Sequence, residues 1–215
     1  MTIPVGESSV KFPIYLQNLD ILSPDSIYLL DYKIDSLKTP FYNNDKKHVL
    51  LRIYKENEFA TTQRNTFYNY TSSYVITPGT PVITRRPTNA NQVFPLGQDS
   101  VRMLAGDESF GEYKTALKGI NDKSITVVVG GQTPQNPLSR AVTIESYRNI
   151  DVVQLTPLGV YNNTFVINII STPDGRRTYY KEFRLHYKYR LLETSPYKEV
   201  KAILRMEFNP RADQL

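Results

Sequence analysis

A strict alternation of apolar and polar residues near the C-terminal end constrains the fold of this chain more than any other feature. Within residues 181–191, every second residue is apolar: Phe183, Leu185, Tyr187, Tyr189 and Leu191. Residues 200–208 repeat the pattern with Val200, Ala202, Leu204, Met206 and Phe208, although Ile203 breaks the polarity of the other face. Because side chains of a β-strand point alternately to opposite faces, both segments are predicted to be strands with one buried face.

A third strand is predicted at residues 164–171, which are β-branched and apolar. The sequence Pro173-Asp174-Gly175 follows it. Asp-Gly supplies the positive φ angles of a tight turn, so residues 164–191 are predicted to form a β-hairpin.

Shorter strands are predicted along the rest of the chain, at residues 12–22, 26–34, 48–55, 74–77, 82–85, 125–129, 141–146 and 152–155. A small hairpin is expected around residues 78–81, and long loops at 86–100 and 130–139. One helix is predicted near residues 109–119, since Ser109 and Glu112 have the spacing of a capping box and Gly119 is placed to end it.

These elements predict an all-β fold, an antiparallel β-sandwich of jelly-roll or Greek-key type with one short helix and extended termini. The expected organisation is an N-terminal arm at residues 1–11, a single domain at 12–208 and a C-terminal tail at 209–215. No shift in composition requires a second domain.

No motif in the sequence carries recognisable chemistry. The chain has no cysteine, which excludes disulfides, thiolate metal ligands and cysteine nucleophiles. His48 and His186 lack metal-ligand spacing and are interpreted as surface residues, and Asp107-Glu108 is interpreted as the first turn of the helix. We therefore expect no catalytic residue, no metal, no cofactor and no enzymatic activity.

Positive charge is concentrated in one region. The chain has a net charge of +5, but residues 176–205 hold nine cations and three glutamates and so carry +6. The outward row of the predicted strand comprises Arg184, His186, Lys188 and Arg190, and Lys201 and Arg205 widen it if the last strand lies alongside. Alternate residues of a strand lie about 6–7 Å apart, close to the spacing of phosphates along a nucleic acid. The row is interpreted as a polyanion-binding face, a charged subunit interface or a solvated face.

Tyrosine is the other abundant feature, with 16 residues. Tyr68, Tyr70 and Tyr74 cluster in the sequence and are candidates for an aromatic interface, since tyrosine is favoured at protein contacts. Ordinary strand packing explains them equally well.

Three functions remain open at this stage. The first is a virion structural protein, such as a capsid, capsid-accessory, neck or tail component of a bacteriophage. It would assemble with copies of itself and other structural subunits, and its basic face would meet nucleic acid or an acidic neighbour. This predicts a virion location after synthesis in the host cytoplasm, with neither signal peptide nor transmembrane segment and no contact with a membrane.

The alternative is a monomeric module that binds polysaccharide or another polyanion, with its site in the loop at 86–100 or 130–139 and nearby tyrosines. A jelly-roll-type enzyme is the third hypothesis.

Overall fold

The computed structural model describes residues 13–15, 17–18, 21–35, 37–38, 45, 47–88, 90–109, 116–133 and 136–210. Within these ranges the fold is antiparallel β with one short helix, α1 (Ala116–Lys123). The strands are β1 (Tyr28–Lys33), β2 (His48–Ile53), β3 (Thr66–Thr77), β4 (Ile83–Arg85), β5 (Asn91–Gly97), β6 (Ser100–Leu104), β7 (Ser124–Thr133), β8 (Asn136–Ser146), β9 (Asp151–Gln154), β10 (Thr164–Ser171), β11 (Arg177–Arg190) and β12 (Lys198–Phe208). The all-β prediction is confirmed.

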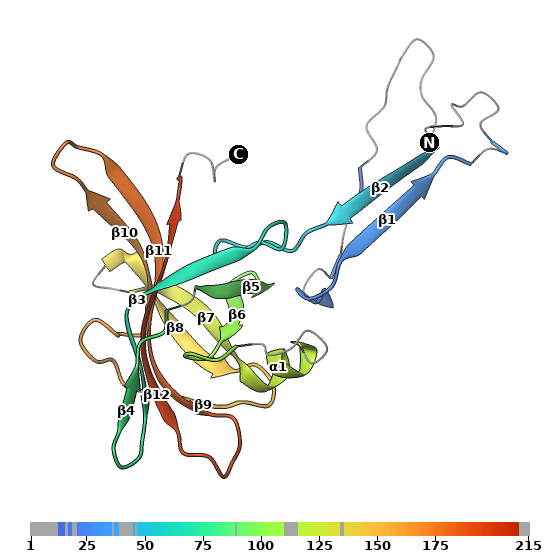
Figure 1. The fold of residues 1–215 in the computed structure, drawn as a ribbon. Coiled ribbons are helices and arrows are strands. Elements are labelled where there is room, and N and C mark those ends of the chain that lie inside the picture. The colour runs from blue at the N-terminus through green and yellow to red at the C-terminus, as the bar shows by residue number, and fades with distance from the viewer. Residues whose placement is uncertain are drawn as a thin grey trace.

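Eight of the strands described close into a barrel, as Figure 1 shows. The order is β10-β8-β7-β6-β5-β3-β12-β11, and β11 pairs again with β10 to complete the ring. Strands β4 and β9 are additions that pair with β3 and β11. The sandwich prediction is corrected by this pairing, because strands that follow one another in the chain lie side by side and the last pairs with the first, as in an up-and-down barrel.

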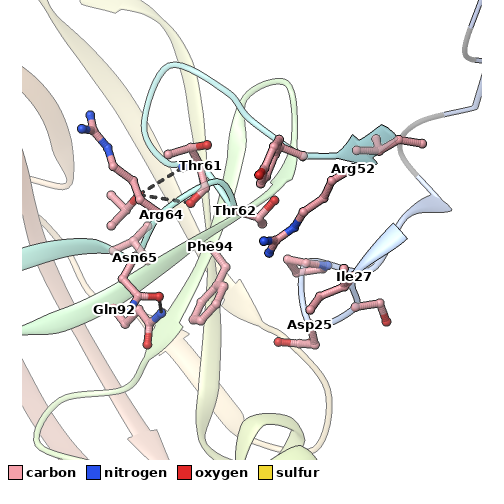
Figure 2. A pocket seen from close by; sticks show the side chains of 15 residues that line it. Asp25, Ile27, Arg52, Thr61, Thr62, Arg64, Asn65, Gln92 and Phe94 are labelled. Atoms are coloured by element: carbon pink, nitrogen blue, oxygen red, sulfur yellow. Dashed lines mark hydrogen bonds between the residues drawn. The ribbon is translucent and has the colours of Figure 1, made fainter. Parts of the chain in front are cut away.

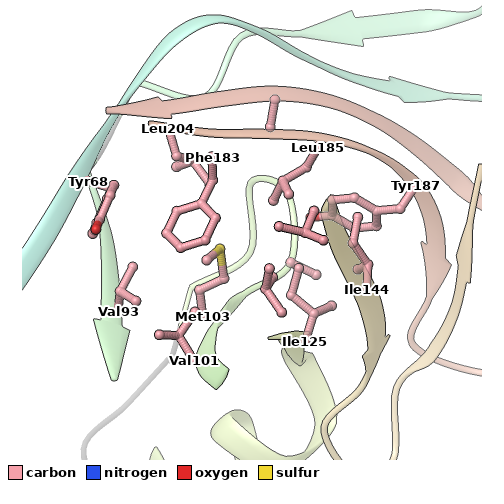
Figure 3. Packing of buried hydrophobic residues seen from close by; sticks show 14 of the residues in the cluster. Tyr68, Val93, Val101, Met103, Ile125, Ile144, Phe183, Leu185, Tyr187 and Leu204 are labelled. Atoms are coloured by element: carbon pink, nitrogen blue, oxygen red, sulfur yellow. The ribbon is translucent and has the colours of Figure 1, made fainter. Parts of the chain in front are cut away.

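The interior of the barrel is filled with apolar side chains (Figure 3). The rings of Phe59 and Phe183 pack against Phe165, with centroids 4.9 and 5.1 Å away. The predicted inward face of β11 is confirmed, since Leu185 is fully buried. Each such side chain contributes about 1.5–3 kcal/mol by leaving water. Because side chains occupy the inside of this small barrel, a binding site has to lie on its wall or its rim.

Several local predictions are wrong. The described residues of 12–22 form no strand. The expected loop at 86–100 contains β5, which pairs with both β3 and β6 despite the turn-forming residues Pro95 and Gly97. The expected loop at 130–139 is largely the continuation of β7 and β8 into a hairpin. Of the predicted helix at 109–119, residues 110–115 lie outside the described residues, Ser109 is not helical, and residues 116–119 belong to α1, which continues to Lys123.

The predicted hairpins and long strands are confirmed. Strand β10 has the predicted bounds, and it pairs with β11 from Thr164 opposite Arg184 to Ser171 opposite Arg177. The small hairpin of β3 and β4 also forms. The predicted arm at residues 1–11 lies outside the described residues, as do residues 211–215 of the predicted tail.

Strands β1 and β2 form a separate hairpin that projects from the barrel (Figure 1). A buried ion pair ties the segment before β1 to the barrel wall. Arg102 on β6 donates two hydrogen bonds to the carboxylate of Asp25, at 2.5 and 2.7 Å. Its guanidinium also lies over the ring of Phe94, 4.4 Å from the centroid. Among the residues described, no helix has the length and hydropathy of a membrane span.

Candidate functional site

The barrel wall has a gap along one edge of β3. Residues 66–68 of this strand pair with β5, and residues 75–77 pair with β4. Between them, in the described part of the chain, no strand pairs with this edge. Pro87 follows β4, and because proline has no N–H it favours departure of the chain from the ladder.

A cleft of about 400 Å³ lies at this gap, here called the gap cleft. Its size falls within the range of small-molecule sites. Strands β3 to β5 and the loop between β6 and α1 supply its walls, including Phe67, Tyr70, Arg85, Arg86, Asp107 and Glu108.

A bulge in β3 separates the predicted tyrosine cluster. Ser72 has a φ of 48°, and the register with β12 shifts at this point. The hydroxyl of Ser73 accepts a hydrogen bond from the Ile203 backbone N–H at 2.9 Å, which replaces a missing ladder bond. Because a bulge inserts one residue, Tyr70 and Tyr74 face opposite sides of the wall.

Tyr70 and Tyr187 hold the loop that forms the floor of the gap cleft. The Tyr70 hydroxyl donates to the carbonyl of Gly106 at 2.5 Å, and the Gly106 N–H donates to the Tyr187 hydroxyl at 2.8 Å. Burial raises the pKa of both tyrosines, so both hydroxyls stay protonated. Gly106 has a φ of 50°, and a Cβ here would lie 3.0 Å from the Tyr189 ring. Close approach and positive φ together require glycine.

The carboxylates of the cleft are neutralised from the barrel side. Glu108 accepts hydrogen bonds from Lys198 Nζ at 2.7 Å and from the Tyr189 hydroxyl at 2.9 Å, and Lys123 Nζ lies 3.7 Å away. Burial acts to raise the pKa of Glu108, but the bonds from Lys198 and Tyr189 outweigh it, and the pKa is lowered. Asp107 lies 3.8 Å from the same Lys198 Nζ. Both carboxylates therefore face cations within the protein.

Two arginines and an aromatic ring line the solvent side of the gap cleft. The Arg85 side chain is 68% exposed, and its nearest carboxylate, that of Asp107, is 4.0 Å away. The Arg86 guanidinium lies over the Tyr74 ring, 5.2 Å from its centroid. Phe67 is 46% exposed and lies opposite Gln92 of β5. The cleft therefore combines an accessible aromatic face with guanidinium and amide donors.

A second hollow lies where the segment before β1 meets the barrel (Figure 2). In Figure 2, Arg52 extends towards it from the hairpin, whereas Arg64 points away. Its volume is about 150 Å³. Since small-molecule sites usually exceed about 300 Å³, we assign this hollow to the junction between hairpin and barrel.

The predicted basic row lies on the outer face of β11 and β12, where carboxylates and a tyrosine ring face its cations. Arg184 and Arg205 both bond to Glu182, whose own side chain is 1% exposed. Burial acts to raise the pKa of Glu182, but these two bonds outweigh it and lower the pKa. Arg190 pairs with Asp151 at 2.6 Å, and Lys188 Nζ lies over the Tyr197 ring. The polyanion role of the row stays a prediction.

His186 is not a surface residue, which corrects its interpretation. Its Nε2 lies 2.9 Å from the carboxylate of Glu199, and its Nδ1 lies 2.6 Å from the carbonyl of Thr156. Lys201 Nζ approaches the same carboxylate at 3.1 Å. Hydrogen bonds from His186 and Lys201 lower the pKa of Glu199. His48, by contrast, is exposed and pairs with Asp31.

The aromatic candidates have different surroundings. Tyr68 is fully buried, and its hydroxyl donates to the carbonyl of Phe59 at 3.0 Å, so it offers no surface to a partner. Tyr70 lies in the gap cleft, and Tyr74 supports Arg86. An interface role for Tyr70 and Tyr74 stays a prediction.

Sequence reasoning missed Phe67, Arg85, Asp107 and Glu108 as site residues. Asp107 and Glu108 precede α1 and face Lys198 of β12, rather than serving the first turn of a helix. Glu108 and Lys198 lie 90 positions apart in the sequence, and no local sequence pattern predicts that their side chains meet. Among the described residues, no three or more histidine, cysteine or carboxylate side chains gather as a metal site.

The solved structures to which this chain is similar include proteins from bacteria of the genus Bacteroides. A protein of unknown function from Bacteroides ovatus has a TM-score of 0.55 and 12% sequence identity, over 90% of this chain and 62% of that chain. An auxiliary nutrient binding protein from Bacteroides thetaiotaomicron has a TM-score of 0.47 and 14% identity, over 83% and 56% of the two chains. A further protein of unknown function from Bacteroides ovatus has a TM-score of 0.47 and 13% identity, over 78% and 54%.

The chain thus spans less than two thirds of the Bacteroides ovatus protein with the TM-score of 0.55. No curated protein sequence matches it. A family model described as "-like, C-terminal" matches residues 47–205, a range that includes the whole barrel apart from the end of β12.

The virion hypothesis is wrong, and so are the bacteriophage, capsid and tail assignments made with it. The chain matches a family model over residues 47–205, and the similar structure with a TM-score of 0.55 is a Bacteroides protein of unknown function rather than a capsid or tail protein. The prediction failed because extended ends, tyrosine-rich strands and polar loops are common to many all-β proteins. The family model covers well over half of the residues, and the chain belongs to this "-like, C-terminal" family.

Proposed function

We propose that this chain is a non-catalytic carbohydrate-binding domain of a bacterial protein, and that the gap cleft is its binding site. The observation that carries the proposal is the exposed ring of Phe67 in a cleft that also presents Arg85, Arg86 and Gln92. A sugar ring has an apolar face that stacks on an aromatic side chain, and hydroxyl groups at its edges that bond to planar polar groups. The similarity to Bacteroides proteins supports a bacterial setting.

The state of the carboxylates supports binding without catalysis. A glycosidase needs a carboxylic acid whose pKa is raised, so that it can protonate the leaving group. In the gap cleft, Lys198 and Tyr189 lower the pKa of Glu108 and keep it ionised. Lys198 also faces Asp107, so both carboxylates are engaged in holding the loop in place.

The proposal is tested by titrating the purified chain with a panel of plant and microbial oligosaccharides, followed by calorimetry on those that bind. Phe67→Ala is expected to weaken binding at least tenfold while the melting temperature stays unchanged, because the ring is partly exposed. Phe208→Ala is the matched control, since this ring lines other hollows of the molecule. Absence of binding to every oligosaccharide, or loss of binding only in Phe208→Ala, would contradict the proposal.

A further inference from the structure

The gap cleft carries an excess of positive charge on its solvent side. Three cations approach its two carboxylates, Arg85 from the mouth and Lys123 and Lys198 from the barrel side, and Arg86 lines the cleft as a fourth. Lys198 approaches Asp107 and Glu108 within 4.0 Å, and Lys123 approaches Glu108. The negative charges are therefore balanced from within, and the charge of the two arginines is left facing the cleft.

The geometry of Arg86 suits recognition of a planar anion. Its guanidinium lies over the face of Tyr74, with the centroid 5.2 Å away, and one terminal nitrogen is 3.4 Å from the Tyr74 hydroxyl. Stacking restricts the orientation of the guanidinium while leaving most of its N–H donors at the edge of the plane. An arginine held in this way loses less conformational entropy when it binds a carboxylate through two parallel hydrogen bonds.

Arg85 lies opposite Val75 of β3 and adds a second accessible cation at the cleft. Its side chain is 68% exposed, and its ion pair with Asp107 spans 4.0 Å. A contact this long and exposed is weak, so Arg85 exchanges it for a ligand at little cost. Phe67 lines the same cleft and offers its ring for stacking.

We propose that the gap cleft selects an acidic oligosaccharide, a chain of uronic acids, whose carboxylates bind Arg85 and Arg86 while one of its sugar rings stacks on Phe67, farther along β3. This inference rests on the proposed function and names the class of carbohydrate that the same site takes. Carboxylate recognition by the arginines supplies the selectivity, and the aromatic ring supplies contact that a neutral sugar shares.

The test compares hexasaccharides of polygalacturonate and alginate with their carboxyl-reduced counterparts, which keep the sugar chain and lose the charge. Calorimetry at 50 and 200 mM salt is expected to show at least tenfold tighter binding of one acidic hexasaccharide than of its reduced form, with the difference shrinking at high salt. The double variant Arg85→Gln/Arg86→Gln is expected to remove this preference, so that the acidic hexasaccharide binds no more tightly than its reduced form.

Arg177→Gln is the matched control, because Arg177 is an exposed arginine on β11 outside the cleft and its loss leaves the preference intact. Equal binding of acidic and reduced forms, or binding of neutral oligosaccharides alone, would overturn the uronic acid inference while the proposed function stands. Failure of every oligosaccharide in the panel to bind would overturn the proposed function and this inference with it.

Discussion

Gly106 occupies a position that tolerates no side chain. Its backbone has a φ of 50°, and its two peptide groups bond to Tyr70 and Tyr187 across the end of the barrel. A methyl group would lie 3.0 Å from the Tyr189 ring and 3.2 Å from Val75. The residue thus fixes the depth of the gap cleft and the position of the carboxylates that follow it.

Gly106→Ala is expected to lower the free energy of unfolding by about 2–4 kcal/mol, because steric crowding adds to the cost of a positive φ. Gly159→Ala separates the two effects, since Gly159 has a φ of 57° and no heavy atom within 4 Å of a Cβ. Its cost is expected to be about 1 kcal/mol. Urea denaturation measures both, and equal losses would show that crowding at Gly106 is negligible.

Glu182 is the buried carboxylate to which Arg184 of β11 and Arg205 of β12 bond. Its folded-state pKa is lowered from 4.5, with burial opposing and Arg184 and Arg205 causing the shift. A lowered pKa means that the pairing stabilises the fold above about pH 4.5 and that this contribution is lost as the pH falls through the folded-state pKa.

Glu182→Gln is therefore expected to destabilise the protein at pH 7 by about 1–3 kcal/mol, and by progressively less as the pH falls through the folded-state pKa and the natural carboxyl becomes protonated. Denaturant unfolding at a series of pH values measures this difference. A loss that is independent of pH would show that packing, rather than charge, accounts for the role of Glu182.

At the scale of elements, the hairpin of β1 and β2 depends on its attachment to the barrel, because an isolated two-stranded sheet is marginally stable in water. The attachment includes the pair of Arg102, whose side chain is 1% exposed, with Asp25. Asp25→Asn leaves the buried guanidinium without its counter-charge, which costs about 3–5 kcal/mol in comparable pairs.

Hydrogen exchange of residues 21–27 is the measurement that isolates this effect, and faster exchange is expected in Asp25→Asn. The control is Asp35→Asn, which removes an exposed carboxylate 3.7 Å from Lys38. In this variant the exchange of residues 21–27 is expected to stay unchanged. Unchanged exchange in both variants would mean that other contacts hold the segment.

Elements were predictable where the local pattern and the tertiary environment agreed. Most of β11 and β12 follows from alternation, because each has one face towards the core, and β10 follows from its β-branched, apolar residues. Strand β5 was missed because Asn91, Pro95 and Gly97 are turn residues, yet neighbours on both sides provide its pairing. The bulge at Ser72 could not be predicted either, since it depends on how β3 is aligned with β12.

At the scale of the molecule, the closure of the strands into a ring could not be predicted from the sequence. It requires β12 to pair with β3, whose partner residues are some 130 positions away, and no local signal encodes such a pairing. The gap cleft has the same origin: Phe67 lies where β3 pairs with β5 and Arg85 where β3 pairs with β4, while Glu108 is positioned by Lys198 of a distant strand. Local reasoning found the strands but not the site that they enclose.

The closed barrel has a continuous core, so loss of one interior side chain is expected to destabilise the whole domain. Leu185 is fully buried, and Leu185→Ala is expected to lower the free energy of unfolding by about 2–5 kcal/mol in a single transition. Leu192 lies just beyond β11 and is 66% exposed, so Leu192→Ala is expected to have an effect below about 0.5 kcal/mol. A small loss in Leu185→Ala would contradict the packed interior.

The location of the binding site is the central claim, and backbone amide shifts in nitrogen-15 NMR spectra test it most directly. Upon addition of an acidic hexasaccharide that binds, the amides of Phe67, Arg85, Gln92 and Asp107 are expected to shift with one common saturation curve. Shifts confined to the outer row around Arg184 and Lys188 would contradict the account, because they would place the ligand on the face where the cations meet Glu182 and Tyr197.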